Sequence, residues 1–281
     1  VLIVARAGPG REEAAKMGLS IGAQTDLAKA QVLFLAMPAE HQSEALNQLE
    51  RLGKANQIVL SLAKGLSEKT LPELAQQKAP SVLFGLVSGP SFAVDLLAGK
   101  PTALTLAHPN AGDLCHKLSG SQLRFYPSAD LTGVAIFGAM KNVIAIACGL
   151  VDGLDLGHSA RSALMTRGLF EIKRLSAALG GLDETASSLA GIGDLSLTCN
   201  SIQSRNFSFG RALAKGEPLD AVLVEGKRTC YFACTMASKL GIELPISAAV
   251  QAIIDGRLTP QQAVRSLMTR PLPRSQGGFF Q

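Results

Sequence analysis

Residues 133–151 read GVAIFGAMKNVIAIACGLV, a run that is apolar except for Lys141 and Asn142. The run is close in length to the roughly 20 residues that a membrane-spanning helix requires. However, a lysine at the bilayer centre costs about 2.5–3.5 kcal/mol even on a lenient insertion scale, and many of the other residues are Gly or Ala. We therefore predict no membrane span and instead a helix buried at the centre of a helical domain.

Helical spacing continues on both sides of this run. No convincing strand follows residue 131, and the helical segments end near glycine stops such as Gly180 and Gly241. The sequence therefore predicts an all-α domain over residues 128–281. Its expected helices are Leu131–Val151, Ser159–Leu179, Ser204–Lys215, Thr229–Leu240, Pro245–Asp255 and Pro260–Met268.

Residues 1–127 instead alternate between short β-rich runs and helix-like stretches, which is typical of a doubly wound α/β domain. Several of the runs are apolar without alternation, as expected for strands that are buried on both faces of a parallel sheet. The expected strands are Val1–Ala5, Val32–Met37, Ile58–Leu62, Val82–Val87, Thr102–Ala107 and Leu123–Tyr126. The expected helices are Arg11–Met17, Glu40–Leu52 and Lys69–Gln77.

Composition narrows the class of partner. Of the 281 residues, 47% are hydrophobic and 17% are charged, which excludes a disordered chain. The net charge of +5 arises without basic blocks, and the chain has no Trp and only two Tyr, so stacking platforms for single-stranded nucleic acid are scarce. We expect an anionic small molecule as the partner, and no nucleic acid.

The cysteines favour a reducing compartment. Five cysteines at wide spacings do not form a disulfide framework, and Cys230 and Cys234 have no second pair that would complete a zinc site. No signal peptide is visible. We therefore predict a cytoplasmic protein without a metal site.

Two lysines are candidates for chemistry. Lys141 is the only ionisable group on its apolar helix, and burial would depress its pKa toward the range useful for proton transfer. Alternatively, Lys141 reaches the surface at a domain boundary. Lys64 follows the strand Ile58–Leu62, at the edge where open α/β sheets bind ligands, unless it is an ordinary loop lysine.

Three further segments offer polar groups. Asp194 follows Gly193 and is either a turn cap or the partner of a buried lysine. Ser88–Ala93 reads as a strand-to-helix turn that could be purely structural or could bind a ligand. Gln203–Asn206 opens a helix with Ser204 at its N-cap, where Arg205 opposes the helix dipole unless an anion is bound.

Arg6 ends the first expected strand. If that strand is the second strand of a dinucleotide-binding fold, an arginine there accommodates the 2′-phosphate of NADP. Otherwise it is a strand-end arginine of no consequence. Arg6 therefore favours NADP over NAD without deciding between them.

Seven motifs occur in the order found in one known family: Ala63–Leu66, Ser88–Ala93, Lys141–Ile146, Thr166–Leu169, Gly193–Leu195 with Leu197–Cys199, Gln203–Asn206 and Val224–Gly226. On these motifs the chain resembles bacterial NAD(P)-dependent glycerol-3-phosphate dehydrogenase. The resemblance implies a Rossmann-type dinucleotide-binding domain followed by an all-α domain, similar to 6-phosphogluconate dehydrogenase. It also implies that NADP or NAD serves hydride transfer between dihydroxyacetone phosphate and sn-glycerol 3-phosphate, which supplies phospholipid synthesis.

The resemblance further implies roles for individual positions. Lys141 looks like the proton donor and acceptor, Lys64 like the lysine near nicotinamide and substrate, and Asp194 like the supporting acid. The implied substrate contacts are Lys64, Gly89, Ser91, Lys141, Asp194, Ser204, Arg205 and Asn206, the last three of them around the phosphate. The implied cofactor neighbours are Arg6, Lys64, Ala93, Arg205, Leu223 and Glu225.

Two departures from the family's pattern concern the cofactor. The family begins with a strand and a Gly-x-Gly-x-x-Gly-type turn, whereas the run Ala7–Glu12 holds only Gly8 and Gly10. The segment before Val224 also looks several residues short. We expect a first strand and its glycine turn to precede Val1, so that a length of 281 residues is too short by at least one strand.

Two alternatives stay open at this point. A related two-domain hydroxy-acid dehydrogenase with an unphosphorylated substrate would not need Arg205. A non-catalytic dinucleotide-binding relative would bind the cofactor without turnover. The sequence also leaves a homodimer open.

Overall fold

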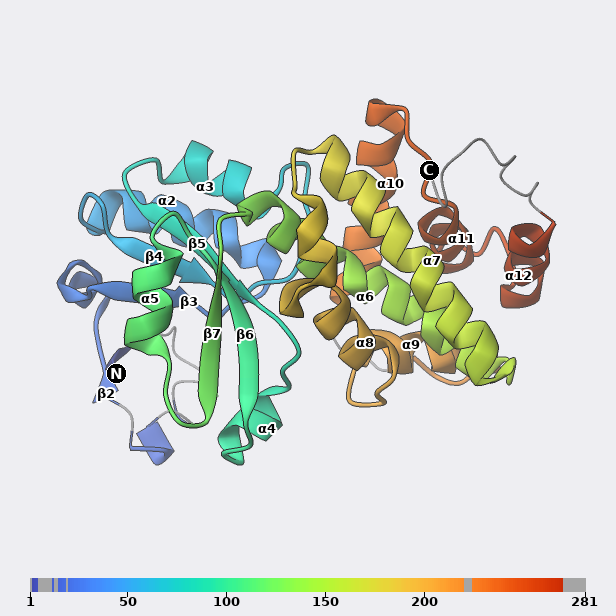
Figure 1. Ribbon diagram of the computed structural model, residues 1–281, viewed down its shortest axis with the longest axis horizontal. Helices are drawn as coiled ribbons and strands as arrows, with labels where there is room; N and C mark the ends of the chain where they lie inside the picture. Colours follow the sequence, from blue (N-terminus) through green and yellow to red (C-terminus); the bar gives the residue numbers. More distant parts are fainter. Residues whose placement is uncertain (1, 5–11, 13–14, 19, 220–223, 270–281) are drawn as a thin grey trace.

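The computed structural model of the chain describes residues 2–4, 12, 15–18, 20–219 and 224–269, which form an α/β unit beside a helical unit (Figure 1). The main sheet has the order β3-β4-β5-β6-β7. Its strands are β3 (Val32–Leu35), β4 (Ile58–Ser61), β5 (Leu83–Ser88), β6 (Thr102–Ala107) and β7 (Leu123–Ser128). A separate parallel pair joins β1 (Leu2–Ile3) to β2 (Ser20–Ile21).

The predicted α/β class is confirmed, but the main sheet is mixed. Strands β3, β4 and β5 are parallel, β6 is antiparallel to β5, and β7 is parallel to β6. The apolar pattern indicates a strand that is buried on both faces, and it carries no information on the direction of that strand. The sequence therefore predicted the strands better than it predicted how they pair.

Helices cover both faces of this sheet. Successive residues of one strand point to opposite faces of the sheet. On one face, Leu60 of β4 and Val87 of β5 pack against α5 (Ala111–Leu118). Val59 and Leu86 pack instead with α2 (Gln42–Leu52) and α3 (Leu71–Lys78). Helix α5, which the sequence pattern did not predict, is short and carries polar residues in its first and last turns.

Helix α6 (Leu131–Gly153) forms the centre of the helical unit, as predicted (Figure 1). It is the one described helix whose length and composition would suit a membrane crossing, but its apolar window is entirely buried inside the protein. The helices packed around it or following in sequence are α7 (Gly157–Ala178), α8 (Asp194–Cys199), α9 (Arg205–Lys215), α10 (Glu225–Leu240), α11 (Pro245–Ile254) and α12 (Pro260–Met268). No strand occurs in the described residues after Ser128.

Helix α10 begins at Glu225, earlier than the predicted start at Thr229. Gly226 lowers helix propensity, which is why the pattern placed the start later. In the structure, the Gly226 amide donates to Asn206 Oδ1 at 2.9 Å, and a Cβ at this glycine would lie 2.7 Å from the same oxygen. A tertiary contact with α9 therefore extends the helix. The expected helix Arg11–Met17 lies partly outside the described residues; of those described, Glu12, Ala15 and Lys16 are helical.

Glycines allow α6 and α9 to touch backbone to backbone. A Cβ at Gly149 on α6 would overlap Phe207 O on α9, and a Cβ at Gly210 on α9 would overlap Ile146 O on α6. Because both helices carry candidate site residues, this close packing fixes the distance between Lys141 and the start of α9.

We predict that Gly149→Ala lowers the free energy of unfolding by about 1–3 kcal/mol, because the added methyl group overpacks the α6–α9 contact. Urea denaturation followed by circular dichroism measures this. Gly112→Ala on α5 is the matched control, because a Cβ there meets open space; that change should raise stability by up to about 1 kcal/mol through helix propensity. Equal effects of the two substitutions would contradict the prediction.

Candidate active site

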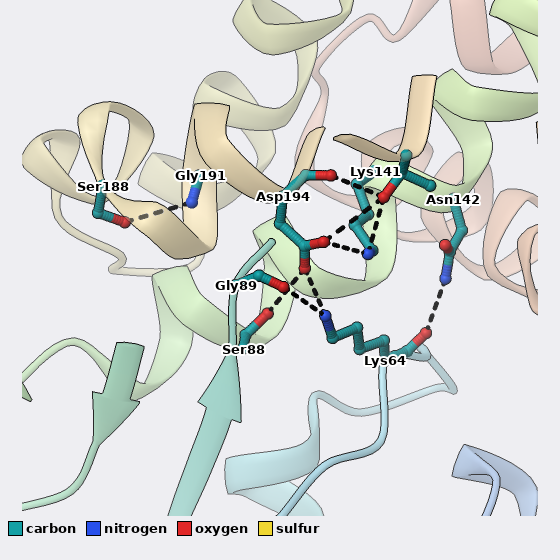
Figure 2. A network of polar contacts seen from close by, with 9 residues as sticks. Lys64, Ser88, Gly89, Lys141, Asn142, Ser188, Gly191 and Asp194 are labelled. Atoms are coloured by element: carbon teal, nitrogen blue, oxygen red, sulfur yellow. Dashed lines mark hydrogen bonds and ion pairs between the residues drawn. The ribbon is translucent and has the colours of Figure 1, made fainter. Parts of the chain in front are cut away.

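Lys64, Lys141 and Asp194 meet where the two units join (Figure 2). Lys64 Nζ donates to Asp194 Oδ2 at 2.5 Å, and Lys141 Nζ donates to Asp194 Oδ1. The Asp194 side chain is fully buried, and the side chains of Lys141 and Lys64 are 10% and 20% exposed. The structure thus brings together the three residues that the sequence singled out for catalysis.

Local structure explains how each charge reaches this point. Lys64 lies in the loop that follows β4, and Lys141 lies midway along α6. Asp194 opens α8 directly after a π-helical turn, Leu189–Gly193. A side chain at Gly191 within this turn would overlap Thr185 O, so the tight turn requires glycine.

Thr198 completes the cluster on the side of the helical unit. Lys141 Nζ donates to Thr198 Oγ1 at 2.9 Å, and this hydroxyl donates to the Asp194 backbone carbonyl at 2.6 Å. Thr198 was part of a quoted motif but received no role from the sequence. Its spacing of four residues from Asp194 could have indicated that the two side chains lie together, because residues i and i+4 share one helix face.

Burial and the neighbouring charges shift both protonation equilibria. Burial, and after it the positive charge of Lys64, lower the pKa of Lys141 to about 8 against the opposing attraction of Asp194. Burial alone would raise the pKa of Asp194, but the ammonium groups of Lys64 and Lys141 outweigh this and hold it below its ordinary value. Asp194 is therefore ionised at neutral pH, and Lys141 is poised to exchange a proton.

A backbone carbonyl of the α/β unit and a side chain of α6 hold Lys64 in place. Its Nζ also donates to Gly89 O at 3.3 Å, and Asn142 Nδ2 donates to Lys64 O at 3.1 Å. Gly89 has φ +151°, and a Cβ there would lie 3.1 Å from Leu104 Cα, so this turn requires glycine. Ser88, which received no role from the sequence, donates from Oγ to Asp194 Oδ2 at 3.3 Å.

The start of α9 brings the three candidate phosphate ligands to this region. Ser204 caps the helix by accepting a hydrogen bond from the Phe207 amide at 3.3 Å, as its N-cap position predicted. Arg205 is exposed, and Asn206 is buried against Gly226. Burial raises the pKa of Glu225, while the charges of Arg205, Lys141 and Lys64 oppose the rise, so Glu225 lies within electrostatic reach of the cluster.

The remaining predicted residues do not join the charged cluster. Ser91 is half-buried and Ala93 is exposed at the start of α4 (Ala93–Leu97). Within the described part of the chain, neither residue hydrogen-bonds to Lys64, Lys141 or Asp194. Arg6 and Leu223 lie outside the described residues.

A cleft of about 470 Å³ opens beside the cluster, between the loops that follow β3 and β4 and the start of α10. A second hollow of about 660 Å³ lies against β6, β7 and residues 182–193. The first is at the carboxyl ends of parallel strands, where doubly wound sheets bind dinucleotides. Its lining consists of Pro38, Ala39, Glu40, Gly65, Leu66, Phe209, Leu219, Val224, Glu225, Lys227, Arg228 and Thr229. The described residues hold no group of His, Cys, Asp and Glu suited to a metal ion.

The sequence of this chain is similar to those of one group of known enzymes. The profile "NAD-dependent glycerol-3-phosphate dehydrogenase N-terminus" matches residues 14–113, and the corresponding C-terminus profile matches residues 130–265. A Sinorhizobium fredii protein named glycerol-3-phosphate dehydrogenase [NAD(P)+] is 45% identical over 276 residues, which cover 95% of this chain and 83% of that protein.

Solved structures agree with the sequence comparison. The crystal structure of glycerol-3-phosphate dehydrogenase from Coxiella burnetii superposes with a TM-score of 0.85 at 36% identity. The match covers 90% of this chain and 82% of that one. The α/β unit followed by a helical unit is therefore the arrangement of that enzyme as well.

We predict that Asp194→Asn lowers the pKa of Lys141 below about 8, because the substitution removes the negative charge and leaves the burial and the charge of Lys64. The ¹³Cε chemical shift of Lys141, followed by NMR during a pH titration, measures this. Asp183→Asn is the control, because Asp183 pairs with Lys173 at an exposed position. A Lys141 pKa that stays constant or rises in Asp194→Asn would contradict the electrostatic account.

Proposed function

The chain belongs to the NAD-dependent glycerol-3-phosphate dehydrogenase family, and from this premise we propose that it interconverts dihydroxyacetone phosphate and sn-glycerol 3-phosphate. One observation carries the proposal: a buried lysine, held by a buried aspartate, lies beside a cleft at the carboxyl ends of parallel strands. A proton donor and a dinucleotide site are what carbonyl reduction by hydride transfer needs.

The cleft fits a nicotinamide dinucleotide. The loops after β3 and β4 approach so closely that a Cβ at Gly65 would overlap the Ala39 methyl group, and both residues line the cleft. When bound, NADP or NAD supplies the hydride chemistry. We assign Glu225, Lys64, Ala93 and Arg205 to its binding, and Glu225 is supported by its place in the cleft lining.

Lys141 supplies the proton in this proposal. As the substrate ketone is reduced, its oxygen gains negative charge, and the Lys141 ammonium stabilises that charge and then protonates the oxygen. In the oxidative direction, neutral Lys141 accepts the proton from the alcohol. A pKa of about 8 makes both forms accessible near neutral pH.

Asp194 and Lys64 assist from the two sides of the cluster. Asp194 keeps the Lys141 ammonium oriented and, through its own negative charge, retains a proton on it at neutral pH. Lys64 adds a second positive charge at the substrate oxygen, where its exposed fraction allows it to turn from Asp194 toward a ligand. Gly89 and Ser91, on the turn that receives Lys64 Nζ, belong to the proposed substrate contacts.

Ser204, Arg205 and Asn206 form the proposed phosphate site. The first amides of α9 and the Arg205 guanidinium point to an anion, since a cation alone is unfavourable at a helix N-terminus. The phosphate does not react, so its binding energy serves to orient the carbonyl carbon.

The finer parts of the proposal are a preference for NADP, a cytoplasmic location, a homodimer, and a role in supplying phospholipid synthesis. The location is supported by the five cysteines, all of which are free. We place the division between the domains at residues 127 and 128, near the end of β7 and the start of α6.

We predict that Lys141→Ala lowers kcat by about 10²–10⁴-fold, the usual contribution of a positioned acid or base. NADPH and NADH oxidation by the full-length protein, with dihydroxyacetone phosphate, is followed by absorbance. Lys239→Ala, at the exposed end of α10, should retain wild-type turnover. Wild-type activity in Lys141→Ala would refute the proposed acid, and cofactor binding without any turnover by the wild type would show a binding protein instead of an enzyme.

We predict that Arg205→Ala raises KM for dihydroxyacetone phosphate about 10–100-fold, because it removes a charge-assisted bond to the phosphate. Inorganic phosphate should compete with substrate in the wild type and lose this effect in Arg205→Ala. Arg265→Ala on α12 is the matched control. An unchanged KM in Arg205→Ala, together with no competition by phosphate, would favour an unphosphorylated hydroxy acid as the substrate.

A further inference from the structure

Ser88 is a buried hydroxyl that contacts the charged cluster from the sheet. It is the last residue of β5, it is 4% exposed, and its Oγ donates to Asp194 Oδ2 at 3.3 Å (Figure 2). Asp194 belongs to the helical unit, so this hydrogen bond crosses the junction between the two units. None of the roles proposed above includes Ser88.

The two oxygens of Asp194 face different units. Oδ1 accepts a hydrogen bond from Lys141 of the helical unit, and Oδ2 accepts hydrogen bonds from Lys64 and Ser88 of the α/β unit. A carboxylate that is held at one oxygen only can rotate about its side-chain torsion. The donors at Oδ2 therefore control whether Oδ1 stays on Lys141.

The two donors at Oδ2 differ in freedom. Lys64 has a long side chain that lies in a loop, is 20% exposed and also bonds to Gly89 O. Ser88 has a single side-chain carbon and lies on a strand that is paired on both sides. Gly138 of α6 borders the hydroxyl, since a Cβ there would lie 3.1 Å from Ser88 Oγ. Ser88 is thus the donor that stays in place.

We propose that Ser88 is a positioning residue for proton transfer by Lys141. Its hydroxyl holds Asp194 Oδ2, so that Oδ1 remains on Lys141 while Lys64 turns toward the substrate. This inference rests on the proposed function, in which Lys64 has a ligand of its own. Ser88 itself touches neither substrate nor cofactor in this scheme.

A pH profile reports on this role. The groups that act electrostatically on Lys141 are Lys64 from the loop after β4, Asp194 and Cys199 from α8, and Glu225 from α10. Burial raises the pKa of the Cys199 thiol well above its ordinary value, so Cys199 is neutral. Without Ser88, Asp194 supports the ammonium less well, and the alkaline limb of kcat for ketone reduction should move to lower pH.

The test compares three variants of the full-length protein in the reduction of dihydroxyacetone phosphate. We expect Ser88→Ala to lower kcat about tenfold, to change KM less than about threefold, and to shift the alkaline limb downward. Ser88→Thr keeps the hydroxyl, so its kcat and the pH of its alkaline limb should return to the wild-type values. Ser176→Ala is the matched control, since Ser176 is a buried serine of α7 whose hydroxyl has no hydrogen-bond partner among the described residues.

Three results would overturn the inference: kcat and pH profile of Ser88→Ala equal to those of Ser176→Ala, a change confined to KM, or no recovery in Ser88→Thr. If Ser88→Ala does not fold, Ser88→Cys, with similar volume and a weak donor, is judged by the same criteria. If the wild type has no turnover, the proposed function fails separately. The Lys141 pKa measured by NMR then decides, because Ser88→Ala should lower it and an unchanged value would overturn the role of Ser88.

Discussion

Asp194 places one fully buried carboxylate between two ammonium groups that come from different parts of the chain. A buried ion is costly unless it is paired and hydrogen-bonded, so the cluster constrains everything around it. Lys64 and Lys141 satisfy the carboxylate, and Thr198 accepts from Lys141. The excess positive charge that remains is suited to a substrate oxygen that gains negative charge during reduction.

The fold serves this cluster by close approach of backbones. Helix α6 is buried along residues 133–151, which keeps Lys141 away from water and lowers its pKa. Glycines at the α6–α9 contact bring the start of α9 toward the same region. At the α/β unit, the turn at Gly89 directs a carbonyl to Lys64. Glycines therefore lie at the contacts where catalytic groups from separate elements come together.

Much of the architecture follows from local patterns. All five strands of the main sheet and the long helices were predicted, because buried strands and core helices leave apolar runs of different length. Helix α5 and the early start of α10 at Glu225 were missed, because short polar segments and Gly226 carry weak local signals. The antiparallel direction of β6 was likewise absent from the apolar pattern.

For the site, the residue types and their positions along the chain indicated the unusual groups: a lysine in an apolar helix, a glycine-flanked aspartate, and an arginine opposing a helix dipole. Motif order then related them to one family. The folded chain was needed to show that Lys141 is buried, that Asp194 contacts both lysines, and that Ser88 and Thr198 complete the cluster. The reason is physical: burial and charge pairing depend on groups 53 to 130 residues apart in the chain, and local sequence does not encode such distances.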